Sequence, residues 1–241
     1  MKTLYFKHDK EVNVHFVSDY HFGHANIIKY CNRPFLSAYD QKNFTDNGSN
    51  WNNDWGKKYR PDKDSVRMMD EEFLKNTNDL VQEQDILVDM GDWAFGYGDK
   101  YYSTCKYYRD RIICKNVYHV WGNHDEEDHE DRNGRFVKGI NDLFTGCYDK
   151  VTFVINGQPI VFDHFFNAVW DKSHKNTWHL YGHSHSGIEE WADRIMPGRR
   201  AFDVGIDNIY KLFGKFRPIN FDEVSDVMKK RNGFIQFTPR G

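Results

Sequence analysis

Residues 117–125 read VYHVWGNHD, a short apolar run that ends abruptly in a polar cluster. The first five residues are β-branched and aromatic apart from one histidine, which predicts a β-strand. Gly122, Asn123, His124 and Asp125 follow it directly. Because ligands bind at the carboxyl ends of strands in open α/β sheets, this stretch predicts an α/β domain with a polar site at a sheet edge.

The same succession of an apolar strand and a polar cluster occurs at four other places in the chain. The clusters are Ser18-Asp19-Tyr20-His21, Asp89-Met90-Gly91-Asp92, Asp163-His164 and Gly182-His183-Ser184-His185. They follow predicted strands at 12–17, 86–88, 159–162 and 178–181. One Asp-x-His or His-x-His pair would be weak evidence, but five strand ends with such side chains indicate one shared site.

The segments between these strands complete the predicted order of elements. Helical spacing of apolar residues occurs at 25–30, 66–81 and 221–230. Asn156-Gly157 predicts a hairpin turn between strands at 151–155 and 159–162, and a final strand is expected at 234–238. This order predicts a mixed α/β domain whose second half is predominantly β.

The strand-end side chains are nitrogen and oxygen ligands for divalent metals. In an extended chain, residues two apart point the same way, so both members of each Asp-x-His or His-x-His pair could reach one site. Histidines, two carboxylates and one carboxamide suit Mn, Fe, Zn or Co, and the absence of a cysteine motif disfavours a structural zinc cluster. The candidate ligands are Asp19, His21, Asp92, Asn123, His164, His183 and His185.

Seven ligands exceed what one catalytic metal needs and fit two metals that share a bridging carboxylate. Such pairs, roughly 3.5–4 Å apart, activate a water molecule and bind a phosphoryl group. The glycines beside the ligands, Gly91, Gly122 and Gly182, permit sharp turns and close approach of the backbone.

The order of these motifs, from Asp19 to His185, resembles that of the calcineurin-like metallophosphoesterase superfamily. Residues 203–207 (DVGID) resemble a late motif of its small members, and residues 18–35 (SDYHFGHANIIKYCNRPF) are similar to short bacterial and phage-encoded members. The resemblance covers most of the chain. It implies a single metallophosphoesterase domain over 1–241, folded as a four-layer αββα sandwich with two mixed β-sheets.

The resemblance also implies roles for individual residues. Asp19, His21 and His185 would hold one metal, while Asn123, His164 and His183 would hold the other, with Asp92 as the bridge. His124 would act as general acid beside the metals or stabilise the transition state, and Asp125 would orient His124. The implied cofactors are two divalent ions, with Mn expected and Fe, Ni, Zn or Mg as alternatives, and a bridging hydroxide would attack the phosphorus.

Two features depart from the family pattern. Asp19 and Asp92 lie 73 positions apart, which is long for a small member, and a polar, aromatic insertion at about 36–64 accounts for the interval. Its lack of a clear period predicts an irregular segment, either a solvated loop with locally packed aromatic residues or a cap that contacts substrate. Phe165 and Phe166 after His164 also differ from the residues that small members often carry there.

The sequence indicates the residues that contact substrate less clearly than it indicates the metal ligands. His24 could line the site, or it could cap a helix or support a ligand. Arg194, Arg199 and Arg200 could bind a phosphate, with a solvated basic loop as an equal alternative. Lys57, Lys58 and Arg60 lie among aromatic residues, a mixture that suits nucleic acid. The remaining histidines are expected to be structural or exposed; they are His8, His15, His119, His129, His174 and His179.

The leading hypothesis is therefore a dinuclear metal-dependent phosphoesterase acting on a small substrate, by family analogy a phosphodiester of a nucleotide or cyclic nucleotide. The alternatives are a nuclease for single strands or ends, and a metal-bearing binding module with weak turnover. A net charge of −3 and the acidic stretch 126–131 disfavour nucleic acid as a partner.

The same composition bears on the compartment. With no stretch near 20 apolar residues, no secretion signal and four cysteines without C-x-x-C spacing, a reduced, cytoplasmic protein without a membrane span is expected. The sequence leaves the oligomeric state open.

Overall fold

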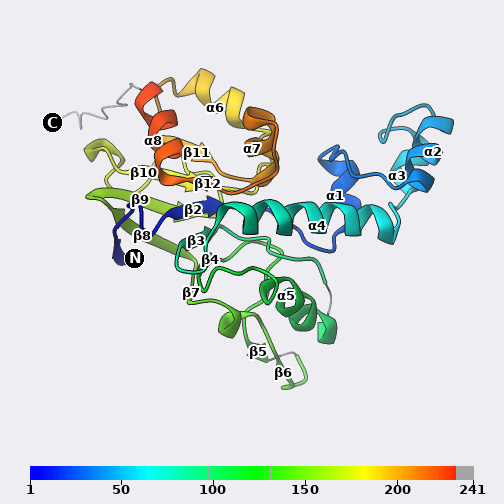
Figure 1. Ribbon diagram of the computed structural model, residues 1–241, viewed down its shortest axis with the longest axis horizontal. Coiled ribbons are helices and arrows are strands. Elements are labelled where there is room, and N and C mark those ends of the chain that lie inside the picture. Colours follow the sequence, from blue (N-terminus) through cyan, green and yellow to red (C-terminus); the bar gives the residue numbers. More distant parts are fainter. Residues whose placement is uncertain (97, 131, 232–241) are drawn as a thin grey trace.

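The computed structural model describes residues 1–96, 98–130 and 132–231, which form a mixed α/β sandwich with two five-stranded sheets (Figure 1). We name the sheets after a central strand. The β2 sheet has the order β12–β2–β3–β4–β7, with bounds Ile219–Asn220, Val14–Val17, Ile86–Asp89, Asn116–Val120 and Gly146–Tyr148. The β9 sheet has the order β1–β8–β9–β10–β11, with bounds Lys2–Phe6, Lys150–Ile155, Gln158–Asp163, Trp178–Tyr181 and Ala201–Asp203.

Both sheets are mixed, as predicted. In the β2 sheet, β2, β3, β4 and β7 run parallel, and β12 is antiparallel to β2. In the β9 sheet, β9, β10 and β11 run parallel, while β8 and β9 form the predicted hairpin. The six strands expected at the polar clusters and the hairpin are confirmed within two residues, whereas β1, β7, β11 and β12 were not predicted. A separate hairpin pairs β5 (His129–Glu130) with β6 (Phe136–Val137).

Helices cover the outer faces of the sandwich. Their bounds are Ala25–Tyr30 (α1), Ala38–Asp46 (α2), Asp54–Lys58 (α3), Lys63–Leu80 (α4), Tyr101–Arg109 (α5), Glu189–Ile195 (α6), Ile206–Phe213 (α7) and Phe221–Lys230 (α8). The predicted helices at 25–30, 66–81 and 221–230 are confirmed as α1, α4 and α8. The second half was expected to be predominantly β, but α6 and α7, which were not predicted, also lie there.

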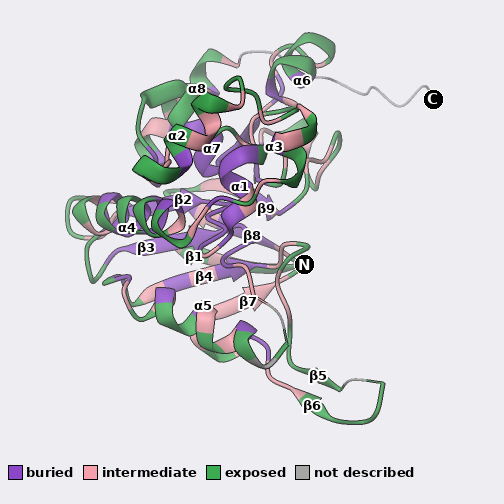
Figure 2. Ribbon diagram, turned by 90° about the vertical axis from the view of Figure 1, so that its right-hand side faces the viewer, coloured by how far each residue is buried: buried purple, intermediate pink, exposed green. Residues whose placement is uncertain are grey.

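Two apolar cores hold the layers together. One core packs α4 and α5 against the outer face of the β2 sheet, for example Met69 and Phe73 against Val17. The other core fills the space between the sheets, where Phe16 stacks on Phe162 with 5.6 Å between ring centroids. Figure 2 shows the buried residues concentrated on the strands and on the inward faces of the helices. These cores fix the carboxyl ends of both sets of parallel strands at one edge of the sandwich.

The insertion at 36–64 is helical, so the predicted irregular segment was wrong. It contains α2, α3 and the first residues of α4. The spacing of apolar residues did not predict these helices, because the buried residue of α2 is an acid, Asp40, and that of α3 is a glycine, Gly56. Asp40 accepts hydrogen bonds from the Tyr59 hydroxyl at 2.5 Å and the Ser65 hydroxyl at 2.5 Å. The insertion is therefore organised by a buried carboxylate, which a hydrophobic pattern cannot reveal.

The remaining expectations concern the chain as a whole. The final strand expected at 234–238 lies outside the described residues. Within the described ranges, no helix has both the length and the apolar character that crossing a membrane requires. All four cysteines are free thiols, as expected.

Candidate metal centre

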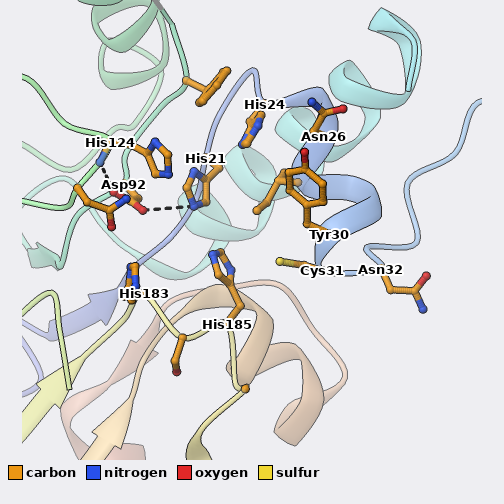
Figure 3. A pocket seen from close by; sticks show the side chains of 15 residues that line it. His21, His24, Asn26, Tyr30, Cys31, Asn32, Asp92, His124, His183 and His185 are labelled. Atoms are coloured by element: carbon orange, nitrogen blue, oxygen red, sulfur yellow. Dashed lines mark hydrogen bonds and ion pairs between the residues drawn. The ribbon is translucent and has the colours of Figure 1, made fainter. Parts of the chain in front are cut away.

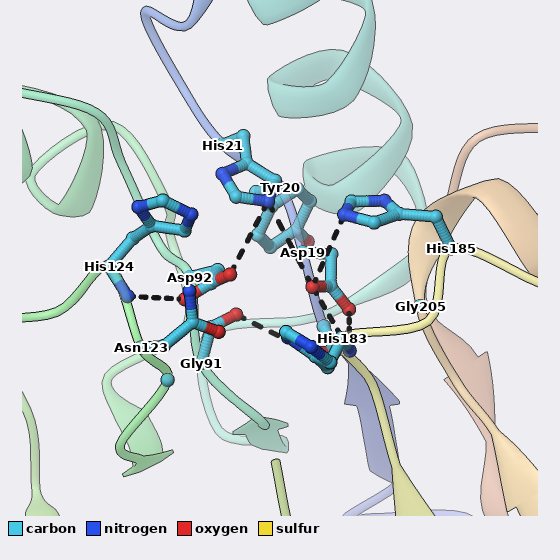
Figure 4. Close-up of polar contacts among 12 residues, drawn as sticks. Asp19, Tyr20, His21, Gly91, Asp92, Asn123, His124, His183, His185 and Gly205 are labelled. Carbon is cyan, nitrogen blue, oxygen red and sulfur yellow. Dashed lines mark hydrogen bonds and ion pairs between the residues drawn. The ribbon is translucent and has the colours of Figure 1, made fainter. Parts of the chain in front are cut away.

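The structure brings the seven predicted ligands together where the two sheets meet. Figure 4 labels all of them except His164. Asp19, Asp92 and Asn123 follow the neighbouring parallel strands β2, β3 and β4, and His164 follows β9. His183 and His185 follow β10, which is parallel to β9. Because parallel neighbours end at the same sheet edge, residues far apart in the sequence converge there.

A cavity of about 940 Å³ opens over these side chains (Figure 3). His21, Asp92, Asn123, His183 and His185 line one side of it. Asp19 and His164 are fully buried and do not line it. The site therefore has a buried floor and an open face that a small molecule can reach.

The first group of ligand atoms contains Asp19, His21 and His185. Asp19 Oδ1 lies 3.9 Å from His21 Nε2 and 3.8 Å from His185 Nε2. These atoms are too far apart for hydrogen bonds, yet all lie within 4.8 Å of one another. This spacing suits one cation that contacts all three.

The second group contains Asp92, His164 and His183, whose ligand atoms also lie within 4.8 Å of one another. Asn123 joins it, since Asn123 Oδ1 lies 3.1 Å from His164 Nε2. His164 Nδ1 donates to the Met90 carbonyl at 2.6 Å. That bond fixes the imidazole tautomer and leaves the Nε2 lone pair directed at the group, as metal-binding histidines require.

Asp92 lies between the two groups. Its Oδ2 is 3.5 Å from His21 Nε2 in the first group and 3.6 Å from His164 Nε2 in the second. Its Oδ1 accepts the backbone N–H of His124 at 2.9 Å. One carboxylate oxygen thus faces both groups, which is the position that a bridging ligand needs.

The electrostatics of the site fit divalent cations. Both ring nitrogens of His21 are buried without a hydrogen-bond partner, which is costly unless something binds them. Burial and the neighbouring Asp19 carboxylate raise the pKa of Asp92 to about 7, against the opposing effect of His164. The Asp19 and Asp92 carboxylates repel each other, and the His21 imidazole lacks a hydrogen-bond partner. The donor set therefore fits cations, which would bind both the carboxylates and the imidazole.

The local backbone is unusual at the ligands. Five of the seven adopt left-handed φ values, namely Asp19 (61°), His21 (52°), Asp92 (57°), His183 (64°) and His185 (45°). The expectation that Asp19/His21 and His183/His185 converge through extended backbone was therefore wrong. Such conformations cost roughly 1–3 kcal/mol each outside glycine and cluster at functional sites. Tyr20, between two of these residues, is fully buried in the helix-covered core.

Glycine is required beside two ligands by close approach. A Cβ on Gly182 would collide with Ser18 and the Asp19 carboxylate, and a Cβ on Gly122 would collide with Asp92. These contacts confirm the expected role of Gly122 and Gly182 in letting the backbone approach the site.

Sequence reasoning missed a buried ion pair that supports the first group. Arg33 donates from Nε and Nη2 to Asp207, both at 2.8 Å, and from Nη2 to the Asp19 carbonyl at 2.8 Å. Asp207 also accepts from His185 Nδ1 at 2.7 Å, which directs His185 Nε2 toward Asp19. Despite its burial, Asp207 has a lowered pKa because the charge and hydrogen bonds of Arg33 and His185 favour its carboxylate. Cys31 lies near His185 and Asp207, but Arg33 already neutralises that carboxylate.

Asp203 is a second missed residue. Its buried Oδ2 accepts from the Ser184 hydroxyl at 2.6 Å and the Ser186 backbone N–H at 3.1 Å, and its Oδ1 accepts from Gly205 N–H at 2.7 Å. Asp203 therefore holds the loop that carries His183 and His185. The motif at 203–207 was recognised by resemblance, but no periodicity in the sequence indicates these contacts.

Asp125 does not have the predicted role of orienting His124. Its carboxylate accepts backbone N–H groups from Asp92 at 2.7 Å, Gly122 at 2.8 Å and Trp93 at 3.1 Å. These bonds use the oxygens that would otherwise face His124, and they tie the loop after β4 to the loop after β3. The His124 ring instead lines the cavity, 5.4 Å from the His21 ring between centroids.

The substrate contacts expected at three arginines are not found at the cavity. Arg199 is buried and donates to Glu189 at 2.8 Å and Asp193 at 2.9 Å, so it supports α6. Arg194 is exposed on α6, and none of the three arginines is among the described residues that line the cavity. His24 does line it, and its side chain makes no capping bond to α1. Of the other histidines, His8, His15, His119 and His179 are buried, while His129 and His174 are exposed.

His119 predicts a pH dependence of stability. It is buried with Nδ1 at 2.6 Å from Asp89 and Nε2 at 3.2 Å from Asp125. Burial alone would lower its pKa, but the carboxylates of Asp125 and Asp89 raise the pKa to about 10. A raised folded-state pKa stabilises the fold fully below the ordinary value of 6.5, and this contribution is lost as pH rises through 10.

We therefore expect His119→Gln to lower the free energy of unfolding by a few kcal/mol more at pH 7 than at pH 10. Urea denaturation of the chelated protein at both pH values measures the difference. A constant difference between His119→Gln and wild type across this range would contradict a charged, buried His119.

Comparison with known proteins finds distant relatives. No family model matches the chain. An uncharacterized protein of Methanocaldococcus jannaschii is 24% identical over 217 residues, which cover 90% of this chain and 92% of that protein. The crystal structure of a protein of unknown function from Aquifex aeolicus aligns with a TM-score of 0.56 and 16% identity, covering 90% of this chain and 99% of that chain. At this identity the likeness shows a shared fold alone.

Proposed function

We propose that the protein is a dinuclear metal-dependent phosphoesterase with the αββα metallophosphoesterase fold. The observation that carries the proposal is the place of Asp92, whose Oδ2 lies 3.5 Å and 3.6 Å from imidazole nitrogens of two separate ligand groups. A shared carboxylate between two sets of nitrogen and oxygen ligands is the arrangement of two-metal hydrolytic sites. The order of the motifs along the chain resembles the same family.

Asp19, His21 and His185 would hold one cation, and Asn123, His164 and His183 the other, with Asp92 in contact with both. When bound, two such cations acidify a water molecule and offset the charge that develops on phosphoryl oxygens. We favour manganese because the donor set mixes imidazole with carboxylate and carboxamide oxygens.

The chain itself supplies the proton for the leaving group. The His124 ring is exposed in the cavity beside the ligands, and its backbone N–H is held by Asp92 Oδ1. His124 is not part of either ligand group. It is thus placed to protonate the departing oxygen of an ester or to stabilise charge on the phosphoryl group.

We propose a small phosphodiester as the substrate. Among the residues that the structure describes, no lysine or arginine lines the cavity, so this lining offers no built cationic contact for a long polyanion. This absence disfavours the nuclease alternative, since nucleic-acid binding depends on cationic contacts to phosphates.

His124→Ala is expected to lower turnover about 10²–10⁴-fold while leaving the metal content nearly unchanged, because it removes an acid and no ligand. Steady-state kinetics on a chromogenic diester and metal analysis of the purified variant measure the two effects. Metal loss in His124→Ala would contradict its placement beside the metals.

The proposed function itself is tested by an activity panel. Chelated protein is assayed with mono- and diesters, nucleotides and oligonucleotides, each with Mn, Ni, Mg and Zn. Metal-dependent diester hydrolysis that Asp92→Asn abolishes supports the proposal. No hydrolysis of any ester with any of these metals would refute it.

A further inference from the structure

The cavity has a second wall that the proposed chemistry does not use. A cavity of about 940 Å³ is at the upper end of the range for drug-sized ligands, so a phosphoryl group at the metals would occupy only part of it. Opposite the ligands, the cavity is lined by His24, Asn26, Tyr30 and Asn32 on and around α1 (Figure 3). Phe95 also lines the cavity, with its ring stacked on His24. We call these five residues the α1 wall.

The α1 wall is aromatic and uncharged. The His24 and Phe95 rings lie parallel, with 3.8 Å between centroids and 9° between planes. His24 Nδ1 is buried without a hydrogen-bond partner, and the residue as a whole is 8% exposed. None of the five residues of the wall is a lysine or an arginine.

Tyr30 supplies an exposed aromatic ring, and the Lys29 ammonium lies over it at 5.5 Å from the centroid. It is 67% exposed although it belongs to a helix that packs against the fold, and its ring lies at 75° to His24 with 6.3 Å between centroids. Aromatic faces left open inside a cavity stack with planar rings of a ligand. The amides of Asn26 and Asn32 each provide donors and an acceptor, which is what a heterocycle with polar edges requires.

The insertion holds this wall in place. Lys29, on α1 beside Tyr30, is 8% exposed, and its ammonium donates to the carbonyls of Tyr59 at 2.7 Å, Lys57 at 3.1 Å and Gly56 at 3.2 Å. These carbonyls belong to α3 and the residue that ends it, where helix carbonyls lack partners. The insertion therefore contacts α1 from outside the cavity, and no described residue of 36–64 lines the cavity.

We propose that the α1 wall binds an uncharged planar heteroaromatic ring of the phosphoester, that is, a nucleobase, and that Lys29 and the insertion hold the wall in position. This inference rests on the proposed function because it assigns the organic part of that substrate. It gives the insertion a supporting role and makes Tyr30 a specificity-determining residue.

The test compares two chromogenic diesters with the same leaving group: the p-nitrophenyl ester of thymidine 5′-phosphate and methyl p-nitrophenyl phosphate. We expect wild type to show a KM at least tenfold lower for the nucleotide ester. Tyr30→Ala should raise the KM for the nucleotide ester at least tenfold more than that for the methyl ester, with kcat affected less. Tyr39→Ala is the matched control, because Tyr39 is 66% exposed on α2 and does not line the cavity.

Equal KM values for the two esters, or an equal effect of Tyr30→Ala on both, would overturn the inference. If neither ester is hydrolysed, the proposed function fails, and calorimetric binding of thymidine 5′-monophosphate tests the wall separately. The inference is supported if wild type binds thymidine 5′-monophosphate at least tenfold more tightly than inorganic phosphate and Tyr30→Ala loses this preference. Equal affinities of wild type for the two compounds would refute the inference.

Discussion

Asp92→Asn is expected to release both metals together. Asp92 Oδ2 faces both ligand groups, and an amide in its place would lack the negative charge that the two proposed cations would share. The loss in affinity for each metal should exceed the roughly 10- to 100-fold that removal of a supporting hydrogen bond costs. Calorimetric titration of the chelated protein with manganese measures both affinities, and diester hydrolysis should fall in parallel.

His185→Gln is the matched comparison, since His185 belongs only to the first group. His185→Gln should weaken manganese binding at the first group and leave the affinity of the second group close to that of wild type. If Asp92→Asn also weakened manganese binding at only one of the two groups, Asp92 would not be the bridge. The asparagine variant keeps the shape of the side chain, so a folding defect would show separately in its denaturation curve.

Arg33→Met is expected to destabilise the protein by about 3–5 kcal/mol, the usual cost of leaving one partner of a buried ion pair alone. The Arg33 side chain is 0% exposed, and the Asp207 carboxylate that it binds is 8% exposed. The variant also releases the carbonyls of Asp19 and Tyr20, which Arg33 holds at 2.8 Å and 3.0 Å. Urea denaturation of the metal-free protein measures the loss.

Arg217→Met provides the control, because the Arg217–Glu223 pair is partly exposed and should contribute at most about 1 kcal/mol. The double variant Arg33→Met/Asp207→Asn should recover part of the lost stability, since no uncompensated carboxylate remains. It should still bind manganese more weakly at the first group, because His185 loses the carboxylate that directs it. Equal destabilisation by Arg33→Met and Arg217→Met would refute the role of the buried pair.

The convergence of the candidate ligands could be predicted from the sequence because each follows an apolar strand within a few residues. The polar residues after a strand can be found from the local sequence. Because β2, β3 and β4 are parallel neighbours, the residues that follow them lie close together in space. The reason first given for the paired ligands was wrong, however. Asp19 and His21 converge through left-handed backbone, which no alternation of side chains reveals.

The supporting residues could not be predicted because their contacts are distant in sequence or involve backbone. Arg33 and Asp207 lie 174 positions apart. The family resemblance implied that Asp125 orients His124, yet its carboxylate accepts three backbone N–H groups instead. Arg199 was predicted either to contact a phosphate or to lie in a solvated basic loop, but it is buried and bound to Glu189 and Asp193. A resemblance or a charge indicates the role of a residue only when the direction of its side chain is known.

The account depends on one arrangement, two cations held by seven side chains around Asp92. Crystals soaked in manganese and measured at its absorption edge test this arrangement most directly. We expect two anomalous peaks roughly 3.5–4 Å apart, with Asp92 in contact with both. A single peak, or none near these side chains, would contradict the account.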